Sequence, residues 1–120
     1  MIQGCVKTPL QNQTLIPNGL RTSNMWDRMR GLLGRRQLDD DQGLWISPCP
    51  SVHTIGMRYP IDVVFLDRQG IVKKIKHHLK PMKFSSCIDA FAVLELSEGM
   101  AKKLQITAGM ELLWETHNVL

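Results

Sequence analysis

Three side chains with metal-ligating or acid–base chemistry, Cys49, His53 and Met57, are spaced four residues apart near the middle of the chain. In extended backbone an even spacing places side chains on one face. A thiolate, an imidazole and a thioether together favour a soft ion such as Cu(I). A straight chain would hold Cys49 roughly 26 Å from Met57, so the three ligands can meet only if the chain bends near Pro50 or Gly56. Soft-metal (copper) binding is therefore one alternative hypothesis for this segment.

Asp62 is the next residue of chemical interest because it enters the apolar segment Ile61–Leu66. An isolated buried carboxylate is costly, so Asp62 needs a partner. It either accepts backbone N–H groups in a structural role or pairs with His53 as the acid–base couple of a hydrolase-like enzyme. Ser47 and Ser51 lie nearby but lack the strand–turn–helix setting of a nucleophile elbow. The enzyme is therefore an alternative hypothesis, and binding without catalysis is preferred.

The leading hypothesis is a ligand- or partner-binding module with a polar pocket around His53 and Asp62. Arginine side chains offer paired donors to a carboxylate or phosphate, and His53 can orient a ligand or change its charge near neutral pH. Asp62 would hold one of the arginines in place. We expect the partner to be a small anionic ligand or a protein, and we expect no cofactor. The predicted site comprises residues that must converge in one hollow from separate elements: Arg30, Arg35, His53, Met57, Arg58 and Asp62.

The clearest predicted helix spans residues 24–33, and a helical turn is expected over residues 98–104. Thr22 or Ser23 can accept hydrogen bonds from the free N–H groups at the start of the helix. A helix on a globular domain buries one apolar stripe. That stripe is expected to consist of Met25, Met29, Leu32 and Leu33.

Seven or eight short strands account for most of the remaining chain. Ile61–Leu66 and Phe91–Leu96 are apolar on both faces, which is typical of covered central strands. Asp67–Gly70 is typical of a hairpin turn, and Pro17–Gly19 is expected to form another turn. Many short strands joined by tight turns favour closed or stacked antiparallel sheets. The predicted fold is therefore mainly β, a compact antiparallel barrel or sandwich in one domain over residues 1–120.

Two further charged features receive a structural interpretation. Glu95 lies in the apolar run Val93–Leu96, so it either faces solvent or meets a partner such as an arginine from the helix. The basic stretch Lys73–Lys83 could touch phosphates, but lysines on a strand more often protect an exposed sheet edge. His77 and His78 are adjacent in an extended segment and point to opposite faces, so they do not form a chelating pair.

Composition limits the classes of protein. A chain of 120 residues with 43% hydrophobic and 22% charged residues is long enough for one packed core. It has no apolar run of the ~20 residues that span a bilayer and no signal-peptide pattern, so we expect a cytoplasmic protein with no membrane partner. Its net charge of +4 and its few aromatic residues are weak for nucleic-acid binding, so nucleic acid is not an expected partner. Its three widely spaced cysteines lack a disulfide or zinc-finger pattern.

Several segments carry a family resemblance: RGLLGR at 30–35, GLWI at 43–46, HTIGM at 53–57, PIDVVFLD at 60–67, VLEL at 93–96 with Gly99, and Ala108-Gly109. Their order resembles the bacterial domain of unknown function 192 family over roughly residues 21–113. The histidine at position 53, without a leader segment, is similar to the cytoplasmic branch of that family. Met110 stands where the family usually has aspartate. The resemblance implies a compact β-rich fold with a short helix, and it implies no established reaction.

Overall fold

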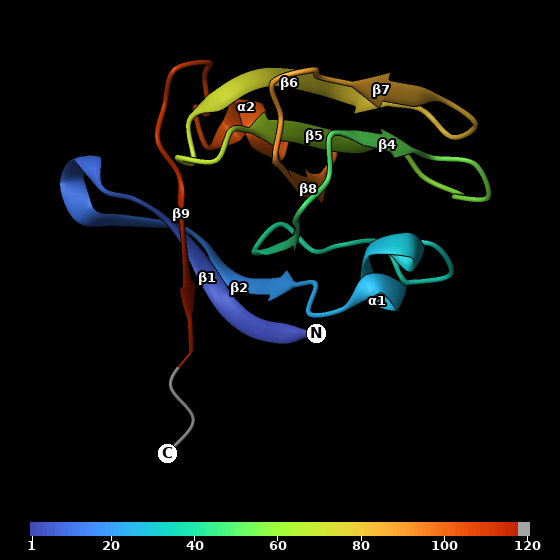
Figure 1. Ribbon diagram of the computed structural model, residues 1–120, viewed down its shortest axis with the longest axis horizontal. Coiled ribbons are helices and arrows are strands. Elements are labelled where there is room, and N and C mark those ends of the chain that lie inside the picture. The colour runs from blue at the N-terminus through green and yellow to red at the C-terminus, as the bar shows by residue number, and fades with distance from the viewer. Residues whose placement is uncertain (118–120) are drawn as a thin grey trace.

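The computed structural model describes residues 1–117 as nine strands, two short α-helices and one short 3₁₀ helix (Figure 1). This confirms the prediction of a mainly β fold with two short helical segments. Within the described residues no helix is long and apolar enough to cross a bilayer. In chain order the elements are β1 (Ile2–Thr8), η1 (Leu10–Asn12), β2 (Gln13–Arg21), α1 (Met25–Arg30), β3 (Gln42–Ile46), β4 (Ser51–His53), β5 (Ile61–Leu66), β6 (Val72–Leu79), β7 (Phe84–Ser86), β8 (Ala92–Ser97), α2 (Met100–Lys103) and β9 (Leu113–Thr116).

Seven strands form one sheet in the order β6-β5-β8-β3-β2-β1-β9, and β4 pairs with β7 in a second, two-stranded sheet. All pairs are antiparallel except β2 with β3, because the chain crosses over through α1 before it returns as β3. The large sheet does not close into the predicted barrel. The segment before β9 meets the start of β6 at one end only, where the Val72 N–H donates to the Met110 carbonyl at 2.8 Å and the Leu112 N–H to the Gly70 carbonyl at 2.9 Å.

The second strand, β2, is longer than its turn residues suggested. The predicted turn at Pro17–Gly19 lies inside β2, where Gly19 pairs with Gly4 of β1. A register shift between Gly4 and Val6 adjusts the pairing of β1 to β2. Turn-forming residue types are therefore accommodated by an irregularity in the strand pair instead of ending the strand.

The two helical segments are shorter than predicted. α1 ends at Arg30, because Gly31 takes a positive φ of 52° with ψ of −126°. Its cap is Asn24, whose side chain accepts the Asp27 N–H at 2.9 Å, in place of Thr22 or Ser23. α2 begins after Gly99, which has a φ of 86° and serves as a cap without a side chain.

The central strands β5 and β8 are buried along their whole length, so both faces of the sheet are covered. Alternate residues of β5 enter different clusters. Val64 and Leu66 pack with Ala101 of α2 on one face, whereas Val63 packs with Leu32, just after α1, on the other. The position of a polar residue in these strands therefore decides which half of the molecule its side chain enters.

Trp114 of β9 lies directly over Gly4 of β1. A Cβ atom at residue 4 would lie 2.5 Å from Trp114 Cζ2 and 2.4 Å from the Glu115 carbonyl oxygen. Because both contacts are shorter than van der Waals separation, Gly4→Ala must displace β9. We expect the free energy of unfolding, measured by urea denaturation, to fall by about 1–3 kcal/mol. Gln3→Ala, at the exposed neighbouring position, should change it little, and equal values for the two variants would contradict this packing account.

Candidate functional site

A small cavity lies on the sheet face opposite α2, between α1, the start of β4 and the strands β3 and β8. Its volume is about 80 Å³, which is room for a few water molecules or a ligand of a few heavy atoms. Its wall is apolar where Leu32, Ile46 and Val52 contribute to the core. The polar and thiol groups that line it come from four separate segments: Arg28, Arg30, Cys49, Ser51, His53 and Glu95.

Glu95 is the buried acid of this cavity. Its neighbours in β8, Leu94 and Leu96, both pack on the α2 face, so the Glu95 side chain enters the opposite face, toward the end of α1. Only 5% of Glu95 is exposed. A Cβ atom added at Gly31 would lie 3.5 Å from Glu95 Oε1, so the backbone that follows α1 lies directly over the carboxyl group.

The Glu95 carboxyl group makes no hydrogen bond or ion pair with any residue between 1 and 117. Burial raises the pKa of Glu95 from 4.5 to about 7, because the charged form loses its hydration. Near neutral pH this group therefore exchanges between its neutral and charged forms. In the first state it can donate or accept a hydrogen bond, and in the second it only accepts.

Cys49 lies beside this acid at the rim of the cavity. Its thiol donates a hydrogen bond to the Ser51 carbonyl oxygen at 2.9 Å. Burial raises the pKa of the Cys49 thiol, and the nearby Glu95 carboxylate adds to that shift. The thiol is therefore protonated at neutral pH, which makes it a poor nucleophile and a poor metal ligand in this state.

α1 places Arg28 and Arg30 at the cavity, although it buries none of its own residues. Of the predicted apolar stripe only Leu32, beyond the helix, is buried, whereas Met25 and Met29 face solvent. The helix is held by polar contacts at its start, where Asp27 accepts the Ser23 N–H at 3.0 Å and lies 3.4 Å from the N-terminal ammonium group. Hydrogen bonds from Ser23 hold the pKa of Asp27 below its usual value.

The structure brings together only part of the predicted site. Arg30, His53 and Met57 line the cavity of Glu95. Arg35 and Arg58 line a neighbouring hollow of about 500 Å³, to which Met57 also contributes, and Arg35 shares a third hollow with Arg30. The Arg35 Nε–H is engaged there by the Gly31 carbonyl oxygen at 3.1 Å. Five of the six predicted residues, all except Asp62, therefore line two adjacent hollows that share Met57.

Asp62 does not lie near this cavity. Its position in β5 matches that of Val64, so its side chain enters the α2 face, where it is 1% exposed. Its two oxygens accept the backbone N–H groups of His78 and Ala101, each at 3.0 Å. The structural role for Asp62 is therefore the correct one of the two alternatives. The predicted His53–Asp62 acid–base pair is wrong, because His53 of β4 lines the Glu95 cavity, whereas Asp62 of β5 lines a different hollow on the α2 face.

The three predicted copper ligands, Cys49, His53 and Met57, do line one cavity, which follows from the bend in the chain that the spacing required. Between residues 1 and 117, however, no three His, Cys, Asp or Glu side chains gather closely enough to hold a metal ion. Cys49, His53 and Glu95 share the cavity without forming such a group. Copper binding at this site stays a prediction and gains no geometric support from the arrangement of the side chains.

Two residues of this cavity, Arg28 and Glu95, were not predicted as site residues. The signal for Glu95 was present in the sequence, because a single carboxylate interrupts an apolar strand. The expected consequence was exposure or an arginine partner, and the structure has neither: Glu95 is buried, and Arg28 and Arg30 line the same cavity without pairing with it. For Arg28 no signal distinguished it from the other arginines of the segment.

The fold and the cavity define a small mainly β domain with a buried acid beneath a short, solvent-facing helix. The chain matches the DUF192 family, described as "Uncharacterized ACR", over residues 21–114, and it belongs to this family. Two solved structures share the fold. A proposed transcription regulator from Sinorhizobium meliloti 1021 has a TM-score of 0.79 and 21% identity, covering 94% of this chain and 92% of its own. A protein of unknown function from Novosphingobium aromaticivorans DSM 12444 has a TM-score of 0.74 and 22% identity, covering 93% and 84%.

At these identities the two structures establish the fold alone. A search of curated proteins finds no match. The family resemblance read from the sequence is confirmed, and so is the compact β-rich fold that it implied. The function of the chain must therefore be argued from its own side chains.

Asp62→Ala should destabilise the protein, because it leaves the buried N–H groups of His78 and Ala101 without an acceptor. We expect the free energy of unfolding to fall by about 2–5 kcal/mol in urea denaturation. Asp40→Ala removes an exposed carboxylate whose ion pair with Lys103 spans 3.9 Å, and it should cost less than about 1 kcal/mol. Similar losses for both variants would refute the structural role given to Asp62.

Glu95 should make stability depend on pH in a predictable direction. Between pH 4.5 and about pH 7 the unfolded chain releases this proton whereas the folded chain keeps it, so stability falls as the pH rises through that window. The expected loss is about 3 kcal/mol, complete near pH 7. Urea denaturation at pH 4.5 to 8 should show this loss in the wild-type chain and not in Glu95→Gln. Glu111→Gln, at an exposed position, should retain the wild-type slope, and parallel curves for wild type and Glu95→Gln would contradict the assignment.

Proposed function

We propose that this protein is a binding module for a small anion that also carries a hydrogen-bond donor, such as a hydroxy- or amino-carboxylate. The observation that supports this proposal is the Glu95 carboxyl group. It is buried, has no partner within residues 1–117, and opens into a cavity that Arg28 and Arg30 also line.

No side-chain oxygen that is fully shielded from solvent within residues 1–117 lacks a hydrogen-bond partner, so the unpaired Glu95 oxygens are reached from the cavity. A ligand whose O–H or N–H group donates to Glu95 can therefore approach them and replace the hydration that burial removes. Asp62, the other buried carboxylate of the central strands, has its hydrogen bonds supplied by the fold itself. Glu95 therefore differs from Asp62 in having acceptor capacity left for an external donor.

The remaining side chains of the cavity suit the anionic part of the same ligand. Arg28 and Arg30 can donate in pairs to a carboxylate, and His53 adds a further donor at the rim. Leu32 and Val52 provide an apolar wall for a short carbon skeleton. The volume limits such a ligand to a few heavy atoms.

Glycolate and acetate test this proposal as a matched pair of probes, because they differ by one hydroxyl group. In ¹⁵N-resolved NMR titrations at pH 7 we expect glycolate to bind with a Kd on the order of 1 mM. It should bind about tenfold more tightly than acetate, because only glycolate can donate to Glu95. The largest chemical-shift changes should occur at Gly31, His53 and Glu95.

Glu95→Leu, which keeps the size of the side chain and removes the acceptor, should bring glycolate down to the affinity of acetate. Arg30→Gln should weaken both probes, whereas Lys76→Gln, an exposed cation on β6, should weaken neither. If glycolate and acetate bind equally to the wild-type chain, or if Glu95→Leu leaves their ratio unchanged, the proposed site is wrong.

A further inference from the structure

We propose that one end of the molecule binds the surface of a bilayer that contains anionic phospholipids. This end, called the apolar tip below, consists of α1 with the following loop to residue 36, the turn over residues 54–58, and the turn over residues 80–84 (Figure 1). The inference goes beyond the ligand proposed for the Glu95 cavity and does not depend on it.

Large hydrophobic side chains project into solvent from every segment of the apolar tip. Single exposed hydrophobic residues are ordinary on proteins, but their concentration in one place marks an interaction site. Of the eleven large hydrophobic side chains that are exposed within residues 1–117, seven belong to this end: Met25, Trp26, Met29, Leu33, Ile55, Met82 and Phe84. Trp26 alone is 78% exposed.

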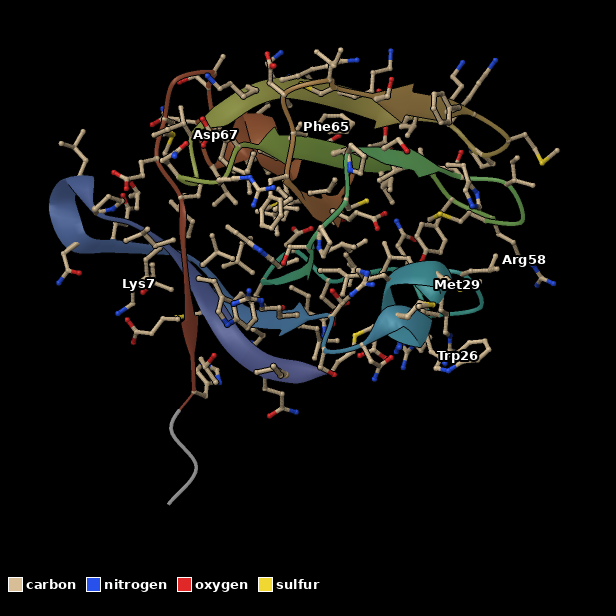
Figure 2. All side chains as sticks on the ribbon, in the orientation of Figure 1. Lys7, Trp26, Met29, Arg58, Phe65 and Asp67 are labelled. Carbon is tan, nitrogen blue, oxygen red and sulfur yellow. The ribbon has the colours of Figure 1, made fainter. Side chains whose placement is uncertain are left out.

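Contacts between the three segments bring them together at one end of the molecule. Leu33 lies against the second segment, since a Cβ atom at Gly56 would be 2.8 Å from Leu33 Cδ1. The Met82 N–H donates to the Thr54 carbonyl at 3.1 Å, which joins the second segment to the third. Figure 2 places the labelled Trp26, Met29 and Arg58 at this end, on the right of the view and away from Lys7 and Asp67.

Cationic side chains belong to the same three segments, and Arg28 and Arg35 among them are half-buried. The cationic residues are Arg28, Arg30, Arg35, Arg36, Arg58, Lys80 and Lys83, and none of them forms an ion pair with another residue of the described chain. Asp27, an acid on α1, is already engaged by the N-terminal ammonium group and Ser23. The apolar tip is therefore both hydrophobic and positively charged, and its charge has no internal counterpart.

An anionic bilayer fits this combination better than the other occupants. A second copy of the chain, paired through the same face, would bring the unpaired cations against one another. A protein partner would need a surface that matches side chains projecting from three separate turns, whereas the headgroup region of a bilayer adapts to such projections. Tryptophan is favoured at the membrane interface, and arginine and lysine bind the anionic headgroups.

This inference departs from the expectation of no membrane partner. That expectation rested on the lack of a long apolar run, which excludes a spanning helix and does not bear on attachment to the membrane surface. Surface attachment needs only exposed apolar side chains beside cationic ones, and these come together here from short segments that are far apart in the sequence.

Co-sedimentation of the full chain with vesicles tests the proposal. We expect at least tenfold stronger partitioning onto vesicles of 70% phosphatidylcholine and 30% phosphatidylglycerol than onto pure phosphatidylcholine, with a decrease at 0.5 M salt. The tryptophan fluorescence should shift to the blue on binding, because Trp26 is exposed whereas Trp45 is buried and Trp114 is half-buried.

Matched variants identify the surface responsible. Trp26→Ser should reduce partitioning at least fivefold, whereas Leu10→Ser, at a side chain that is also 78% exposed, should not. The triple variant Arg36→Gln, Arg58→Gln and Lys83→Gln should abolish the preference for phosphatidylglycerol. Removing the same charge elsewhere, as Lys76→Gln, Lys102→Gln and Lys103→Gln, should preserve it.

Equal losses in the two triple variants would mean that net charge alone attracts the chain, which overturns the proposal. Absence of binding to the anionic vesicles also overturns it and leaves the surface to a protein partner. Neither result would affect the comparison of glycolate with acetate, so the two proposals can fail separately.

Discussion

The burial of β5 and β8 on both faces is the constraint on which the rest of the structure depends. Because the two strands pair in the centre of the sheet, neither has a solvent-exposed side to which a polar residue could turn. Each carboxylate in them must enter one of the two halves of the core, and the half is set by its position in the strand. Asp62 enters the half covered by α2, and Glu95 enters the half covered by the segment after α1.

The two halves of the core differ in the hydrogen-bond donors that they offer to a buried carboxylate. On the α2 face, the irregular pairing of β5 with β6 and the first turn of α2 both leave a backbone N–H group free, and Asp62 accepts both. On the opposite face, the backbone at Gly31 lies over Glu95 Oε1, and its N–H is already donated to the Asp27 carbonyl of its own helix at 2.9 Å. Asp62 therefore stabilises the fold, whereas Glu95 lowers its stability when ionised. A buried carboxyl group of this kind does not lower the free energy of unfolding if it is protonated or if it is bound by a ligand from outside the chain.

Some of this could be predicted from the sequence. The apolar runs Ile61–Leu66 and Phe91–Leu96 identified the central strands because two-sided burial leaves a continuous hydrophobic pattern, and the mainly β class followed from them. The parallel crossover between β2 and β3 could not be predicted, because it depends on pairing between segments with no local signature. The turn predicted at Pro17–Gly19 was wrong for a related reason. Pairing with β1 keeps these residues in β2, and this pairing has no signature in the local sequence.

The site was also predicted only in part, because local spacing carries information about neighbouring residues and none about contacts between distant segments. The even spacing of Cys49, His53 and Met57 predicted that they share a side of the chain, and one cavity contains all three, although only His53 lies in a strand. Nothing local indicates which face of a two-sided strand points to which neighbour, so the pairing of Asp62 with His53 could not be tested by spacing. Glu95 was recognisable as unusual, but its role depended on α1 lying above it.

The position of α1 connects the cavity with the exposed surface. A helix with an apolar stripe ordinarily turns that stripe inward, and packing of the stripe supplies most of its stability. Here the cap at Asn24 and the contacts of Asp27 fix the start of the helix, and Gly31 ends it after six residues. Of the predicted stripe only Leu32, beyond the helix, reaches the core. The same short length holds Arg28 and Arg30 beside Glu95 and leaves Met25 and Trp26 in solvent. The open cavity and the exposed apolar surface are therefore two consequences of one helix boundary.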